Sequence, residues 1–154
     1  MPTTSLTTKD QVVQLLSDLY GLDVSEIEPS TPRIYSIAEY LNEESKAVGY
    51  IACDLETGCR LGAALTQIPA GRVEEAVKDG AMPDSIMENL HEVLNICVNL
   101  LTATGGGRVL LGRSAYGESA EHYSELSKDL ESRTADLVGF EIARYGKCVL
   151  SIST

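Results

Sequence analysis

The residues best suited to chemistry lie in the segment 84–102, where carboxylate and carboxamide side chains recur at helical spacing. They are Glu88, Glu92, Asn95 and Asn99. An α-helix turns about 100° per residue, so positions i, i+4, i+7 and i+11 share one face. Such a face offers only carboxylates and carboxamides to its surroundings. The alternative is an ordinary solvated helix face, since most surface helices carry polar residues opposite apolar ones.

The opposite face of this segment is apolar, which predicts one long helix that packs on a core by a single side. Ser85 and Glu88 have the spacing of a capping box, so we expect the helix to begin close to Pro83. Residues 81–103 contain neither Lys nor Arg, although ordinary exposed helix faces mix both charges. We expect the four polar residues to be exposed and the following residues to be buried: Leu90, Leu94, Cys97 and Leu101.

Other catalytic motifs fit the sequence less well. Residues 107–114 have the spacing of a phosphate-binding loop, but their interior is an apolar, strand-like run and a helix precedes them. His91 lies beside the polar face, yet no serine has the sequence context of a hydrolase nucleophile. Glu88 and Glu92 could form a two-carboxylate acid–base site, but on an open helix face both should remain ionised and hydrated. A metabolic enzyme would need a pocket with convergent polar groups, which the sequence does not indicate.

The four cysteines do not predict a metal site. They are Cys53, Cys59, Cys97 and Cys148. None forms a C-x-x-C pair, whereas structural zinc sites use closely spaced pairs of ligands. We expect reduced thiols and no metal or other cofactor in this chain.

Composition and charge limit the class of protein. The 154 residues suit one domain, and a net charge of −11 without a basic cluster argues against binding to nucleic acid or to an anionic membrane. No apolar run approaches the roughly 20 residues of a membrane helix. Residues 1–10 lack the apolar stretch of a signal peptide, so we expect a cytoplasmic protein.

The remaining elements indicate an α+β domain with a mainly antiparallel sheet, a long surface helix and two shorter helices. We expect residues 1–154 to form one domain with 1–8 flexible, and residues 116–133 to form a loop with a helix or helical turn. Helices are predicted at residues 9–20, 71–78 and 84–102. Strands are predicted at residues 33–40, 46–54, 59–65, 108–112, 136–143 and 148–152. The turn at residues 55–58 should join two of these strands into a hairpin.

The Glu-x-x-Asn motif formed by Glu92 and Asn95 on a long helix resembles the CheC/CheX/FliY family of chemotaxis phosphatases. The layout of residues 49–65, 70–78 and the terminal hairpin is similar to that family, and the single motif is closest to the CheX type. The resemblance implies action on the phosphorylated receiver domain of a response regulator in two-component signalling. Asn95 would position the attacking water, and Glu92 would contact a lysine of the receiver.

The resemblance also implies the surroundings of the site. Glu88, His91 and Asn99 would contact the receiver, which would hold the Mg²⁺ itself, and a homodimer is possible. The chain differs from the family in two respects. Glu88 stands where the family usually has Asp or Ser, and no proline follows Asn95, whereas the family usually has a proline about twenty residues after this Asn. The alternative is a non-catalytic adaptor or regulatory module of the same fold that docks the same helix on a protein partner.

Overall fold

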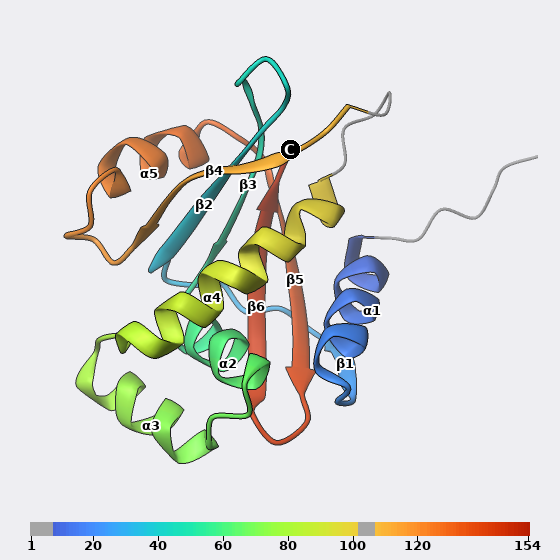
Figure 1. Ribbon diagram of the computed structural model, residues 1–154, viewed down its shortest axis with the longest axis vertical. Coiled ribbons are helices and arrows are strands. Elements are labelled where there is room, and N and C mark those ends of the chain that lie inside the picture. The colour runs from blue at the N-terminus through green and yellow to red at the C-terminus, as the bar shows by residue number, and fades with distance from the viewer. Residues whose placement is uncertain (1–7, 102–106) are drawn as a thin grey trace, which may run out of the picture.

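The computed structural model describes residues 8–101 and 107–154. Its centre is one antiparallel sheet of six strands (Figure 1). The strand order is β1–β5–β6–β3–β2–β4. The strands are β1 Val24–Ile27, β2 Ser36–Leu41, β3 Ala47–Cys53, β4 Leu110–Tyr116, β5 Ala135–Ile142 and β6 Gly146–Ser153. Five α-helices and a 3₁₀ turn complete the described part of the chain: α1 Thr8–Tyr20, α2 Leu55–Leu65, α3 Ala70–Asp79, α4 Asp84–Ile96, η1 Cys97–Leu101 and α5 Tyr123–Glu131.

The helices form layers on both faces of the sheet (Figure 1). Side chains alternate along β2, so Ala38 and Tyr40 belong to the main core with the buried sides of α1, α2 and α4. Ile37 faces the other way and packs with Leu126 of α5 in a second, smaller core. The predicted α+β class with an antiparallel sheet is therefore confirmed.

The segment 59–65 is a helix, and our prediction of a strand there was wrong. Asp54 caps α2 by accepting a hydrogen bond from the backbone N–H of Thr57 at 2.7 Å, so the predicted hairpin turn is a helix start instead. Gly62 lets α2 and α4 approach closely, because a Cβ atom there would lie 2.5 Å from the backbone oxygen of Ile86. A short apolar run buried on most sides gives no periodicity that separates helix from strand.

The long helix begins where predicted but with a different cap. Pro83 is the N-cap of α4 and makes no side-chain hydrogen bond, so the capping box of Ser85 and Glu88 does not form. The α-helix ends at Ile96 and continues as the 3₁₀ turn η1. Gly80 ends α3 in the left-handed conformation (φ 73°), which glycine adopts readily at the end of a helix.

The other predicted elements are present with shifted bounds. The terminal hairpin is β5 and β6, helix α5 lies within residues 116–133, and the short strand β1 was not predicted. Residues 1–7, expected to be flexible, lie outside the described residues, and Thr8 is the first residue of α1. In residues 8–101 and 107–154, the helices are too short or too polar for any of them to traverse a bilayer.

Candidate functional site

The polar face of α4 is exposed, as the sequence predicted. Glu88, Glu92, Asn95 and Asn99 are all exposed, and so is His91 at the edge of this face. The opposite side is closed, because Leu90, Leu94, Cys97 and Leu101 are each at most 5 % exposed. The sequence therefore predicted both sides of this helix correctly.

Two sets of hydrogen bonds hold α4 in place, one to strand β2 and one to helix α2. The buried Tyr40 hydroxyl of β2 donates to the backbone oxygen of Leu94 at 2.7 Å, and burial raises the pKa of Tyr40 so that the donor stays protonated. Asn89 donates to the backbone oxygen of Gly62 at 3.0 Å and to Thr66 Oγ1 at 2.8 Å, which ties α4 to α2. The exposed face thus rests on a helix fixed to the sheet and to a neighbouring helix.

Glu92 and Asn95 are neighbours on this face, three residues apart on successive turns. Within residues 8–101 and 107–154, neither side chain has a hydrogen bond or an ion pair. Asn99 differs, since its Nδ2 donates to the backbone oxygen of Ile96 at 3.1 Å. The carboxylate of Glu92 and the amide of Asn95 are therefore available to a partner.

His91 connects this face to the edge strand β4. Its Nδ1 lies 2.9 Å from the hydroxyl of Tyr116, and the two rings meet edge to face with centroids 6.3 Å apart. Tyr116 comes from the end of β4, which is far from α4 in the sequence. The contact with Tyr116 could not be predicted from sequence spacing.

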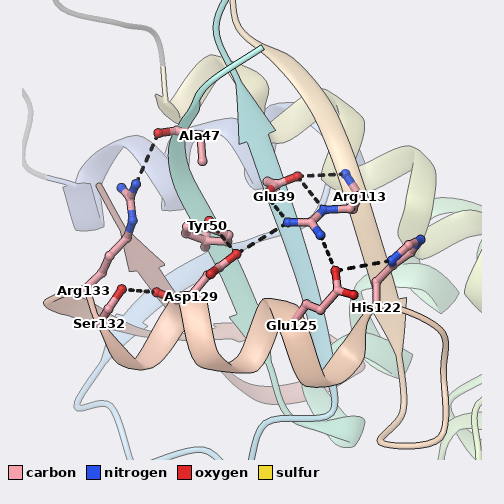
Figure 2. Close-up of polar contacts among 9 residues, drawn as sticks. All are labelled: Glu39, Ala47, Tyr50, Arg113, His122, Glu125, Asp129, Ser132 and Arg133. Atoms are coloured by element: carbon pink, nitrogen blue, oxygen red, sulfur yellow. Dashed lines mark hydrogen bonds and ion pairs between the residues drawn. The ribbon is translucent and has the colours of Figure 1, made fainter.

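A cluster of charged residues that the sequence did not predict lies on the α5 side of the sheet (Figure 2). Arg113 of β4 donates two hydrogen bonds to the nearly buried carboxylate of Glu39 in β2, from Nε at 3.0 Å and from Nη2 at 2.8 Å. Arg113 Nη1 also donates to Glu125 of α5 at 2.7 Å. Glu39 inside the predicted strand 33–40 was the available signal, since a charge on a buried strand face needs a partner, whereas Arg113 lies just beyond the predicted strand 108–112.

This cluster fixes α5 to the sheet. The hydrogen bonds from Arg113 lower the pKa of Glu39 below its ordinary value, although its burial acts in the opposite direction. Tyr50 of β3 donates to Asp129 of α5 at 3.3 Å, and the guanidinium of Arg133 lies 5.0 Å from the centroid of the Tyr50 ring. Because these groups already bind one another, the cluster is structural.

The cysteines are buried thiols of the core. All four are free and buried, and their burial raises the pKa of Cys59 to about 11 and that of Cys97 and Cys148 to about 12. Thiols with such pKa values are poor nucleophiles and poor metal ligands at neutral pH. In the part of the chain that the structure describes, no three His, Cys, Asp or Glu side chains are grouped for metal binding.

A cavity of about 770 Å³ is lined by Tyr116 but not by His91, and its carboxylates are already engaged. Asp54 caps α2, Glu56 pairs with Arg60 at 3.3 Å, and Glu118 lies 3.9 Å from Arg33.

The structure does not form a phosphate-binding loop at residues 107–114, although these residues have its spacing. They lead into strand β4, and the next helix begins only at residue 123, whereas such a loop must open directly into a helix. Neither feature competes with the face of α4.

Comparisons with known proteins give a match in structure alone. No protein-family model matches the chain, and no curated protein sequence matches it. The middle domain of FliM from H. pylori superposes with a TM-score of 0.58 at 7 % identity, covering 95 % of this chain and 84 % of that one. A CheX–CheY–BeF3–Mg complex from Borrelia burgdorferi gives a TM-score of 0.55 at 18 % identity, covering 95 % and 94 %.

A FliG–FliM complex from H. pylori gives a TM-score of 0.55 at 8 % identity, covering 94 % of this chain and 85 % of that one. At such identities the likeness concerns the fold. The three matches cover 94–95 % of this chain and 84–94 % of the other chains, so they concern most of the fold. The chain therefore has the fold shared by CheX and the middle domain of FliM.

Proposed function

We propose that this protein binds the phosphorylated receiver domain of a response regulator through the exposed face of α4 and accelerates hydrolysis of its aspartyl phosphate. The observation that carries the proposal is the pair of Glu92 and Asn95. These two side chains are adjacent, exposed and without a partner in the described part of the chain, on a helix that is otherwise firmly packed. The similarity to a CheX–CheY complex supports a receiver as the partner.

In the proposed reaction, Asn95 positions the water. Its amide holds the attacking water in line with the phosphorus atom and does not itself compete as a nucleophile. The water oxygen forms a new bond to phosphorus as the bond to the aspartyl oxygen breaks. The products are inorganic phosphate, which takes the protons of the water, and the free aspartate of the receiver.

Glu92 provides the ionic contact with the partner. A face without Lys or Arg leaves its carboxylate open to a lysine of the receiver, and such a contact fixes the orientation of the complex. The Mg²⁺ that phosphoryl transfer requires would be held by the receiver. Glu88, Asn99 and His91 surround the pair and would complete the contact surface.

A non-catalytic binding module is the second candidate function. It is favoured by the equally good structural match to FliM, including a complex of FliM with FliG. On this alternative the same face of α4 docks on a protein partner without hydrolysis. The carboxylates and amides then serve only to recognise the partner.

The two candidates separate in one experiment on a panel of purified receivers. Each receiver is phosphorylated with acetyl phosphate, freed of the donor and followed with increasing amounts of this protein, while binding is measured with the beryllofluoride-activated receiver. Faster decay that saturates with protein concentration supports the phosphatase. Tight binding with unchanged decay supports the binding module, and the absence of both effects contradicts the proposal.

A further inference from the structure

We infer that Tyr116 holds His91 as the Nε2–H tautomer, and that this N–H is a hydrogen-bond donor for a phosphoryl oxygen of the bound receiver. The identity of the acceptor rests on the proposed function, whereas the tautomer is a property of the free protein. Tyr116 is a positioning residue in this account, because it acts through His91.

The geometry fixes one nitrogen of the imidazole. His91 Nδ1 lies 2.9 Å from the Tyr116 hydroxyl, within hydrogen-bond distance. The edge-to-face contact of the two rings, at an interplanar angle of 71°, restrains the imidazole further. Tyr116 is only partly exposed at the end of β4, so its hydroxyl is a firm anchor beside an exposed histidine.

Chemistry sets the direction of this hydrogen bond. A phenol is a stronger acid than a neutral imidazole N–H, and an imidazole nitrogen is a stronger base than a phenol oxygen, so the Tyr116 hydroxyl donates and Nδ1 accepts. Burial raises the pKa of Tyr116, which keeps this proton on the hydroxyl at neutral pH. The hydroxyl proton is therefore available to Nδ1.

With Nδ1 as the acceptor, the proton of the neutral imidazole must lie on Nε2. Nε2 is on the other side of the ring from the anchored Nδ1, and within residues 8–101 and 107–154 it has no partner. His91 and Asn95 are four residues apart on α4, so their side chains are neighbours, with Cβ atoms about 5–6 Å apart. The donor thus lies beside the amide that we propose positions the water.

The charge of the face explains why such a donor is useful. A phosphoryl group is anionic, and the carboxylates of Glu88 and Glu92 on this face repel it. No Lys or Arg occurs between residues 81 and 103 to offset them. Asn95 and His91 are side chains of this face that can donate to a phosphoryl oxygen, and one N–H of Asn99 Nδ2 is already used for the backbone oxygen of Ile96.

The tautomer is tested on the free protein by long-range ¹H–¹⁵N correlation of the imidazole rings, which separates protonated from unprotonated ring nitrogens. The chain has only two histidines, so His122→Gln assigns the spectrum. We expect the His91 pattern of an Nε2–H tautomer in the wild type and a mixture of tautomers in Tyr116→Phe, which keeps the ring but removes the hydroxyl. An Nδ1–H tautomer in the wild type would overturn the inference whatever the partner is.

The donor role is tested by binding to a receiver with and without beryllofluoride. We expect His91→Ala to weaken binding of the activated receiver about tenfold and that of the unactivated receiver much less. His91→Gln should restore most of the affinity, since its amide N–H can replace Nε2–H. Tyr116→Phe should weaken binding of the activated receiver less than His91→Ala does, and Tyr123→Phe is its matched control, because it removes a tyrosine hydroxyl that donates to the backbone of Ile34 on the opposite face of the sheet.

Equal losses for both forms of the receiver would assign the acceptor to a carboxylate outside the phosphorylation site and overturn the phosphoryl contact. Unchanged binding in His91→Ala would overturn the donor role altogether. If the wild type binds no activated receiver, the proposed function fails and the phosphoryl contact fails with it. The tautomer measurement on the free protein distinguishes that result from a failure of the Tyr116–His91 argument.

Discussion

At the scale of single residues, the protein contains two kinds of polar group that the structure separates clearly. Glu92 and Asn95 are exposed and lack partners in the described residues, whereas Glu39 is nearly buried and held by Arg113. Groups of the first kind are free for recognition or chemistry, because the fold does not use their interactions. Groups of the second kind serve stability, and their contribution can be measured directly.

Arg113→Ala should destabilise the protein by about 3 kcal/mol, because it leaves the Glu39 carboxylate in a nearly buried position without its cation. The value is at the lower end of the range for buried pairs, since the Arg113 side chain is 36 % exposed. Urea unfolding measures the change. The double variant Glu39→Leu/Arg113→Leu should recover much of the loss, and a double variant no more stable than Arg113→Ala would contradict the assignment.

The same pair predicts how stability depends on pH. The pKa of Glu39 is lowered from its ordinary value of 4.5 in the folded state, so the ionised carboxylate stabilises the fold above that value. This stabilisation is lost as the pH falls through the lowered pKa. The wild type should therefore exceed Glu39→Gln in unfolding free energy at pH 7, and the difference should shrink towards about pH 3. A difference that stays constant over this range would show that the charge of Glu39 does not matter.

At the scale of elements, α4 presents its polar face because α2 lies directly beneath it. Gly62→Ala should lower the free energy of unfolding by about 1–3 kcal/mol, because the added Cβ would lie 2.5 Å from the Ile86 backbone oxygen and force the helices apart. Gly71→Ala in α3 is the matched control, because its Cβ would meet nothing within 4 Å. It should leave stability unchanged or raise it by up to about 1 kcal/mol. Thermal unfolding measures both variants. Equal stability of Gly62→Ala and Gly71→Ala would contradict the close packing of α2 on α4.

The elements also show what the sequence can and cannot predict. The two faces of α4 were predictable because an amphipathic helix records its surroundings in its periodicity, which is why Glu92 and Leu94 were assigned correctly. The segment 59–65 was not, because a buried helix that carries Gly62 at a close contact has no polar face to reveal its period. The pair of Glu39 and Arg113 depends on the pairing of β2 with β4, and the contact between His91 and Tyr116 depends on how α4 packs beside β4; local patterns encode neither.

At the scale of the whole molecule, the sheet ends in two edge strands, β1 and β4. Unpaired strand edges can associate, and Leu110 at the start of β4 is 50 % exposed. We expect self-association through this edge, so sedimentation should detect a dimer at high micromolar concentration, and Leu110→Lys should shift it towards the monomer. A wild type that remains monomeric at that concentration would contradict the prediction.

The central claim is that the face of α4 acts on the phosphoryl group of a receiver, with Asn95 as the group that positions the water. It is tested most directly by single-turnover decay of a phosphorylated receiver over a range of protein concentrations, for the wild type, Asn95→Ala and Glu92→Ala. Gln14→Ala, which removes an exposed amide from α1 outside this face, is the control and should behave as the wild type.

We expect Asn95→Ala to abolish the acceleration at saturation while it retains much of the affinity, because the amide acts on the water in the transition state. Glu92→Ala should instead raise the concentration needed for saturation, by loss of an interfacial ionic contact worth about 2–5 kcal/mol. Decay that is as fast with Asn95→Ala as with the wild type would contradict the central claim.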